Sequence, residues 1–354
     1  MKIFHRLVGC ILTLALLAGL AWAGLVGQAS TSWQYQNPPL RLRPTGLVWA
    51  GLVGQANTSW QYQNPPVRLR LALLGDVMLG RWVGQALCHN GRAGCDWPAA
   101  LSTLAPVLSR ADLALANLES PLTTAPMTRE NYDLRASPKS AQALSASGLD
   151  LISLANNHIM DSGAAGLDET RAALQAWKLQ AVGPNMDPVW RTYGSLRIAF
   201  LAFQDVRPRM DLTAAADVVR QARVAGSLVV VSVHWGSEYQ AGQNARQKEI
   251  AQTLADAGAA LIWGHHPHVL QPLVWLQGAG QPFRTLVAYS LGNALFDQMM
   301  LPDTQQSVVL LVTINQNGVQ EVQAVPFEMD VLRGRVKDAS PQAAEKIFHR
   351  LQIP

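Results

Sequence analysis

Apolar runs and helical patterns alternate along the middle of this chain, and most of the apolar runs end at polar side chains. The apolar runs predict strands at Arg68–Leu74, Leu113–Ala116, Leu149–Leu154, Leu196–Phe203, Leu228–Val233 and Ala260–Trp263. Apolar residues at helical spacing predict helices at Pro98–Arg110, Ala164–Lys178, Ala214–Val224 and Arg246–Ala257. Such alternation favours an α/β fold with a largely parallel sheet and helices outside it.

The pattern changes after the last of these strands. Three further apolar segments follow without long helices between them: Thr285–Tyr289, Ser307–Ile314 and Val319–Phe327. Because short connections join neighbouring antiparallel strands, we expect these segments to close the domain as an antiparallel section.

The N-terminal segment 1–27 has the features of an export or membrane signal. Lys2, His5 and Arg6 precede an uncharged apolar run from Leu7 to Gly27, and Ala21-Trp22-Ala23 has the form of a signal-peptidase site. The run is also long enough for a transmembrane helix. A cleaved signal peptide and an uncleaved anchor are both open, and either places the following domain outside the cytoplasmic membrane.

A duplicated segment separates this run from the predicted domain. Gly19–Arg43 and Gly46–Arg70 differ only at Ala21/Val48, Ser30/Asn57 and Leu40/Val67. Two copies are too few for a solenoid, and the Asn-Pro-Pro sequence favours an extended chain. We therefore interpret 28–66 as a linker, 67–330 as the domain and 331–354 as a C-terminal tail.

Composition excludes some classes of protein. The 354 residues are 49% hydrophobic and 15% charged, with a formal net charge of +4, and basic residues are scattered. This favours a large folded core over disorder and argues against a nucleic-acid partner. Cys88 and Cys95 flank a polar loop, and either a disulfide or two free thiols is open there.

Polar side chains at the predicted strand ends are of the types that bind metals. They are Asp76, Glu119, Asn157 with His158, His234, and His266 with His268. Ligands of open α/β sheets bind beyond the carboxyl ends of the strands, so we expect these side chains to converge. A mixed shell of imidazole, amide and carboxylate groups suits Mn, Fe or Zn.

The sequence Gly264-His265-His266-Pro267-His268 is the strongest single signal, because three histidines in four positions rarely serve packing alone. Two other catalytic classes are disfavoured. The cysteines do not lie at strand ends beside the histidines, and Ser290-Leu291-Gly292-Asn293 lacks the Gly-x-Ser-x-Gly elbow of serine hydrolases.

Six motifs in order resemble the CapA family, which is linked to capsule and poly-γ-glutamate synthesis. The resemblance covers roughly Leu69 to Phe327 and rests on Gly75-Asp76-Val77-Met78, Asn117-Leu118-Glu119, Asn156-Asn157-His158, His234-Trp235-Gly236, His266-Pro267-His268 and Ser290-Leu291-Gly292-Asn293. It implies a fold like that of the calcineurin-type metallophosphoesterases, a four-layer αββα sandwich.

The resemblance also implies roles for individual residues. Asp76 and His268 correspond to ligands of a first divalent metal, His234 and His266 to ligands of a second, and Asn157 to a further ligand. Glu119 takes the place of the carboxylate that bridges the two metals. His158 corresponds to the catalytic general acid or phosphate contact, and His265 is extra. Substrate contacts are predicted for Asn117, Asn156, Ser290 and Asn293.

Two functions are compatible with this resemblance. One is a metal-dependent hydrolase of an envelope phosphoester or polymer linkage. The other is a non-catalytic accessory subunit of a membrane-embedded polymer synthesis or export complex. Met78 stands where the phosphoesterases carry a histidine ligand, and thioether is a poor ligand for such metals. The other expected ligands are all present, which favours metal binding. The methionine at position 78 favours the accessory function.

Overall fold

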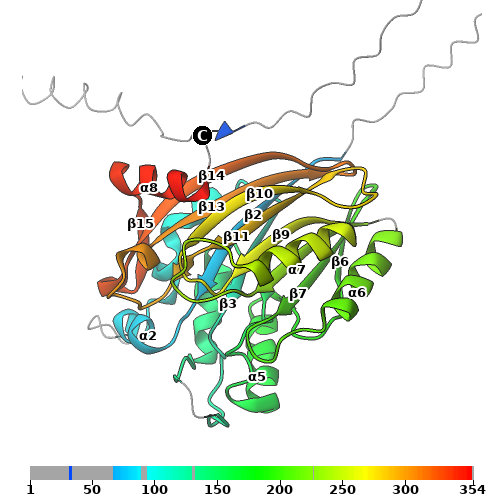
Figure 1. Cartoon of the computed structure of the whole chain (residues 1–354). Coiled ribbons are helices and arrows are strands. Elements are labelled where there is room, and N and C mark those ends of the chain that lie inside the picture. Colours follow the sequence, from blue (N-terminus) through cyan, green and yellow to red (C-terminus); the bar gives the residue numbers. More distant parts are fainter. Residues whose placement is uncertain (1–31, 34–66, 89–93, 130–131, 226, 353–354) are drawn as a thin grey trace, which may run out of the picture. The chain divides into compact units, whose positions relative to one another are not determined.

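The fold is a mixed α/β sandwich of two sheets (Figure 1). The computed structural model describes residues 32–33, 67–88, 94–129, 132–225 and 227–352. The predicted signal or anchor 1–27, and the linker 28–66 apart from Ser32 and Trp33, lie outside these ranges. Among the described residues, no helix combines the length and apolarity needed to span a membrane.

The first sheet has a parallel half and an antiparallel half. Its strand order is β1 (Ser32–Trp33), β14 (Gly318–Asp330), β13 (Gln306–Asn315), β2 (Leu69–Val77), β3 (Leu113–Leu118), β4 (Leu151–Ser153) and β5 (Gln180–Val182). Strands β2 to β5 are parallel, and β13 is antiparallel to both β2 and β14. Two short strands join at the sides: β12 (Asn293–Leu295) beside β2, and β15 (Arg335–Asp338) beside β14.

The second sheet is parallel at its centre. Its order is β10 (Leu270–Gln277), β11 (Arg284–Leu291), β9 (Ala259–His265), β8 (Leu228–His234), β7 (Leu196–Gln204) and β6 (Val189–Tyr193). Strands β7, β8, β9 and β11 are parallel, and the two edge strands are antiparallel to their neighbours. The predicted antiparallel closing section is thus confirmed for β13 and β14, whereas β11 runs parallel to β9.

Alternate side chains of the central strands enter different cores. Leu71 and Leu73 of β2 pack between the sheets with Val230 of β8, while Leu74 of β2 faces outward. In β8, Val231 likewise faces outward. Both faces of these strands are covered, which explains why the sequence shows continuous apolar runs there and not a polar–apolar alternation.

Helices cover the outer face of each sheet. The first sheet packs against α2 (Arg81–Cys88), α3 (Ala105–Leu108), α4 (Ala141–Ala146) and α5 (Gly163–Ala176). The second packs against α6 (Leu212–Val224) and α7 (Ala245–Asp256), drawn in green and yellow-green in Figure 1. Asn244 begins α7 with a capping box, because its side chain and that of Gln247 each accept a backbone N–H of the other.

Three of the four predicted helices are present within two residues of their expected ends. The exception is Pro98–Arg110, which consists of the short helices Trp97–Ala100, Ser102–Leu104 and α3. Pro98 and Pro106 each lack an amide N–H, and each stands at the start of a separate turn. Apolar spacing alone did not show these interruptions.

The segment expected to be a C-terminal tail is part of the folded unit. Residues 335–338 form β15, and α8 (Pro341–Leu351) lies near β13 and β15 in Figure 1. Ile347 and Leu351 of α8 are fully buried in the core between the sheets. Ser340 caps this helix through Ala343 N, which explains why the helix begins there.

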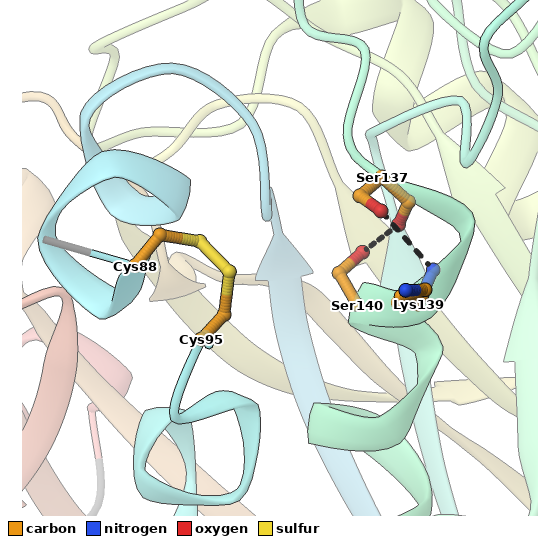
Figure 2. Close-up of a disulfide and its surroundings, with 5 residues drawn as sticks. All are labelled: Cys88, Cys95, Ser137, Lys139 and Ser140. Atoms are coloured by element: carbon orange, nitrogen blue, oxygen red, sulfur yellow. Dashed lines mark hydrogen bonds between the residues drawn. A yellow bond between two sulfur atoms is a disulfide. The ribbon is translucent and has the colours of Figure 1, made fainter. Parts of the chain in front are cut away.

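Cys88 and Cys95 are joined by a disulfide bond (Figure 2). The bond links the end of α2 to the chain that leads into the first short helix. Figure 2 also shows the nearby turn in which Ser137 accepts from Lys139 N and Ser140 donates to the carbonyl of Ser137. Of the two alternatives left open by the sequence, the structure therefore contains the disulfide.

Candidate metal centre

Polar side chains from the carboxyl ends of parallel strands meet where the two sheets face one another. Asp76 is the penultimate residue of β2, beside β3, and His234 ends β8 directly opposite His265 of β9. Contacts cross between the sheets: Glu119 Oε1 lies 3.5 Å from His234 Nε2, and Asp76 Oδ2 lies 3.5 Å from His268 Nδ1. The strand-end convergence expected from the sequence is present for Asp76, Glu119, His234, His266 and His268, and the position of Asn157 as a ligand stays a prediction.

Asp76 is fully buried and surrounded by groups that favour its charge. Its Oδ1 accepts from Asn117 Nδ2 at 2.8 Å, and its Oδ2 accepts from the backbone N–H of His266 at 3.1 Å. His265 Nδ1 also lies 3.1 Å from Oδ1. Burial opposes ionisation, but the neighbouring imidazoles of His265 and His268 hold the pKa of Asp76 well below its usual range.

Glu119 is a second buried carboxylate, placed immediately after β3. Besides His234, it approaches His268, whose Nδ1 lies 3.9 Å from Oε2. Burial raises the pKa of Glu119, and the charge on Asp76 acts in the same direction, against the lowering by His268. A carboxylate in this position gains from any additional cation nearby.

The loop after β9 brings its histidines inward through an unusual backbone. His266 and His268 have φ angles of +91° and +58°, which residues with a side chain seldom adopt. Such conformations persist where surrounding contacts enforce them, commonly at functional sites. Gly264 precedes the loop because a Cβ there would lie 2.1 Å from the carbonyl oxygen of Tyr289.

The pKa values of His234, His266 and His268 are all strongly displaced, but not in the same direction. Burial lowers the pKa of His234 well below its ordinary value and lowers that of His266 to about 3. Burial also disfavours charge on His268, but the carboxylates of Glu119 and Asp76 outweigh it and raise the pKa of His268 to about 9. His234 and His266 are therefore neutral at pH 7, as metal-binding imidazoles must be, whereas His268 has to release its proton when an ion binds to it.

Several buried polar atoms of this cluster have no hydrogen-bond partner within the described residues. They are Oε2 of Glu119, Nε2 of His234, Nε2 of His265 and Nδ1 of His266. Oδ1 of Asn157, the ligand predicted after β4, is buried and unpaired as well. Leaving one such group unpaired costs about 1–3 kcal/mol, so natural proteins seldom collect them. Imidazole nitrogens with carboxylate and amide oxygens are the ligands of Mn, Fe and Zn, and the donor set fits such an ion.

Two overlapping sets have ligand atoms within 4.8 Å of one another. One contains Asp76, Glu119 and His234, and the other contains Glu119, His266 and His268. Glu119 belongs to both sets, as expected of a bridging carboxylate. The sets divide the histidines differently from the resemblance, which pairs His268 with Asp76. The assignment of ligands to individual ions stays a prediction.

His158 lies at the edge of the cluster and is held by a carboxylate. Its Nδ1 lies 2.7 Å from Oδ2 of Asp161, a residue that the sequence analysis did not single out. A positive charge on His158 would lower the pKa of both Glu119 and His234. In the sequence, His158 and Asp161 are three positions apart, which brings two side chains together when the chain forms a turn. The sequence alone did not show that residues 158–161 form one.

The predicted substrate contacts Asn117 and Asn156 lie within the hydrogen-bond network of the cluster. Asn117 bonds Asp76, and Asn156 donates to the Asn117 side chain at 3.3 Å and to the Leu118 carbonyl at 2.8 Å. Asn156 Oδ1 also accepts the backbone N–H groups of His158 and Ile159. Both amides therefore order the residues around them, and their contact with substrate stays a prediction.

Ser290 and Asn293 occupy different surroundings. Ser290 is buried and its hydroxyl accepts from Gly292 N at 3.1 Å. Asn293 Oδ1 lies 2.8 Å from His268 Nδ1, so this amide reaches the cluster itself. Substrate contact stays a prediction for both residues.

Met78 faces away from the metal-binding side chains. It is fully buried in the core between the first sheet and its helices, and its sulfur accepts from Gly80 N at 3.1 Å. Met78 therefore packs in the core, and this position supplies no imidazole to the cluster.

Fold and site together define an α/β-sandwich protein with a buried strand-end cluster suited to divalent metal ions. The chain belongs to the family described as bacterial capsule synthesis protein PGA_cap, which matches residues 70–298. The resemblance to the CapA family inferred from the six motifs is thereby confirmed.

Curated relatives carry names from capsule, PGA or polyglutamine synthesis. The chain is 27% identical over 302 residues to the PGA biosynthesis protein CapA of Bacillus subtilis, covering 78% of this chain and 73% of that protein. It is 29% identical over 288 residues to the capsule biosynthesis protein CapA of Bacillus anthracis, covering 73% and 67%. A probable polyglutamine synthesis accessory protein of Mycobacterium tuberculosis is 28% identical over 266 residues, covering 58% and 70%.

Solved structures are more distant. A hypothetical protein from Thermus thermophilus aligns with a TM-score of 0.47 and 17% identity, over 73% of this chain and 99% of that one. The calcineurin-like phosphoesterase YfkN of Bacillus subtilis aligns with a TM-score of 0.43 and 14% identity, over 81% and 97%.

Proposed function

We propose that this protein acts outside the cytoplasmic membrane in the synthesis of capsular poly-γ-glutamate or a related envelope polymer, as a metal-dependent hydrolase. Its substrate would be an envelope phosphoester or a linkage of the polymer. The observation that carries the proposal is the set of unpaired buried nitrogen and oxygen atoms at the strand ends, which matches a divalent metal site of Mn, Fe or Zn type.

Different residues of the chain have different roles in such a hydrolysis. A bound divalent cation supplies Lewis acidity and an activated water molecule. Asp76, Glu119, His234, His266 and His268, with Asn157, would hold the cation. His158 donates a proton to the leaving group, and Asp161 fixes the ring by binding Nδ1, which assigns the proton transfer to Nε2.

The enzymatic test is an assay of the purified full chain against phosphodiesters and γ-glutamyl polymer with Mn, Fe or Zn added. We expect turnover that is abolished by His234→Ala and by His158→Ala, with metal binding lost only in the former. His349→Ala is the matched control, because His349 is an exposed histidine on α8. Turnover that persists in both site variants would sink the proposal.

A non-catalytic accessory function is the second candidate, and Met78 favours it. The packed thioether at position 78 removes one imidazole from the expected ligand set. A protein with this function would bind metal and polymer without cleaving either substrate class, and would associate with a membrane-embedded synthesis complex. Stoichiometric metal with no turnover on any phosphoester or γ-glutamyl polymer is the result that selects this candidate.

The location outside the membrane is proposed from the apolar run Leu7–Gly27 and the positive residues before it. The size of the mature protein separates the two modes of export: cleavage after Ala23 shortens the chain, whereas an anchor leaves it intact in the membrane fraction. A full-length chain in the cytoplasmic fraction would contradict both.

A further inference from the structure

Asn293 reaches the metal centre from a strand that the expected ligand set does not include. It begins β12, which runs parallel to β2 and places Asn293 opposite Asp76. The side chain is fully buried. An amide therefore lies beside the first carboxylate of the cluster, although the two residues are far apart in sequence.

The orientation of this amide is fixed by its two N–H groups. Nδ2 donates to Oε1 of Gln298 at 2.8 Å and to the carbonyl oxygen of Thr304 at 3.1 Å. The reversed orientation would place oxygen against the Thr304 carbonyl, which cannot donate. Oδ1 is thereby directed into the cluster, where one of its two lone pairs faces His268 Nδ1 at 2.8 Å.

The atoms around His268 Nδ1, Asn293 Oδ1 among them, have spacings close to those of ligands that share an ion. His268 Nδ1 lies 2.8 Å from Asn293 Oδ1, 3.5 Å from Asp76 Oδ2 and 3.9 Å from Glu119 Oε2. Ligands bound at about 2.1 Å from one cation are separated by roughly 3 Å. Amide oxygen is a good ligand for the harder divalent ions, and thioether is not.

We propose that Asn293 is a metal ligand through its amide oxygen, and that it supplies the donor missing at position 78. This inference rests on the metal site of the proposed function. Strand β12 is suited to the exchange because it adjoins the chain at Met78, directly after β2: the carbonyl of Leu295 accepts from Met78 N at 2.8 Å. Gln298 and the main chain of Thr304 act as positioning groups.

The competing explanation is that Asn293 only orients His268, and a double-mutant cycle separates the two. The affinity of the purified full chain for Mn²⁺ is measured calorimetrically in the wild type, Asn293→Ala, His268→Ala and the double variant. We expect Asn293→Ala to weaken binding about 100-fold, the upper end of effects around metal sites. We also expect it to weaken binding at least about tenfold further when His268 is already alanine.

Two further variants guard against a folding artefact. Asn293→Asp keeps an oxygen donor of the same size and should retain Mn²⁺ affinity within about tenfold of the wild type. Asn315→Ala removes a buried asparagine near the opposite end of β2, and should leave the affinity unchanged.

The outcomes are distinct for the two claims. Unchanged affinity in Asn293→Ala, or no additional loss in the His268→Ala background, overturns the ligand role and leaves the proposed function standing. A wild-type chain that binds no Mn²⁺, Fe²⁺ or Zn²⁺ overturns both.

Discussion

His266 and His268 lie two positions apart in one loop, yet their pKa values are displaced in opposite directions. Burial dominates at His266, whereas the carboxylates of Glu119 and Asp76 dominate at His268. Their charge states depend on which neighbours the fold provides, so the sequence His266-Pro267-His268 did not reveal them. The residue identities were predictable, and the electrostatics were not.

The lowered histidines predict acid sensitivity of the metal-free protein. Folded His266 stays neutral down to about pH 3, whereas the unfolded side chain takes up a proton near its ordinary value of 6.5. The unfolded state therefore binds more protons between these values, and stability falls as pH drops through this window. Urea unfolding after chelation should show this slope, and His266→Gln should reduce it.

His268 provides the opposite control. Its raised pKa contributes stability that is fully present below pH 6.5 and is lost as pH rises toward 9. His268→Gln should therefore flatten the alkaline side of the same profile and leave the acid side steep. Equal slopes in all three proteins would contradict the assigned charge states.

Asp161 predicts a separation between catalysis and metal binding. Asp161→Asn keeps the shape of the side chain but removes the charge that faces His158 Nδ1. We expect the turnover number to fall roughly a hundredfold, the scale of general acid–base catalysis, with unchanged metal affinity. Asp168→Asn, an exposed change on α5, should leave both unchanged. Loss of metal in Asp161→Asn would instead indicate a role in holding the ion.

At the scale of elements, strand ends were more predictable than helix continuity. Buried central strands have apolar runs because both faces are covered, so Leu228–Val233 and Ala260–Trp263 matched β8 and β9 closely. The edge strands β6 and β10 have half-exposed faces and were not predicted. Strand β15 was missed because it depends on pairing with β14, a contact that no local pattern encodes. Helix α8 was missed although the Ser340 cap and the helical spacing of Ile347 and Leu351 are local signals.

Gly264 predicts a cost for any side chain at the entry to the histidine loop. In Gly264→Ala the new Cβ would meet the Tyr289 carbonyl at 2.1 Å, so β9 and β11 would have to separate. We expect a loss of about 1–3 kcal/mol in the free energy of unfolding, with weakened metal binding. Gly242→Ala, where nothing lies within 4 Å of the added atom, should be neutral by the same urea titration. Equal stability of the two variants would contradict the close approach.

The Cys88–Cys95 disulfide predicts a redox contribution to stability. The bond closes a short loop with a sequence separation of 7. Constraining such a loop in the unfolded chain stabilises the fold by about 2 kcal/mol. Replacing both cysteines with serine should lower the free energy of unfolding by this amount and abolish the effect of reductant. A wild type unaffected by reductant would contradict a bonded pair in solution.

For the whole molecule, the sequence order of the six motifs predicted both family and convergence, since strand ends of α/β sheets share one edge. Division of the strands into two sheets was implied only by the resemblance. Asn293 shows the limit: its place opposite Asp76 arises from β12 pairing with β2, between residues distant in sequence. The sequence of each segment predicts which polar side chains stand at a strand end, whereas the pairing of β12 with β2 is visible only in the structure.

The metal content of the purified full chain tests the central claim most directly. Elemental analysis after loading with Mn²⁺, Fe²⁺ or Zn²⁺ and removal of excess ion should give at least one equivalent per chain. His234→Ala and Glu119→Ala should lose most of it, and His349→Ala should retain it. Wild-type protein that stays metal-free under these conditions, or that keeps its metal without His234 and Glu119, would contradict a metal centre at the strand ends.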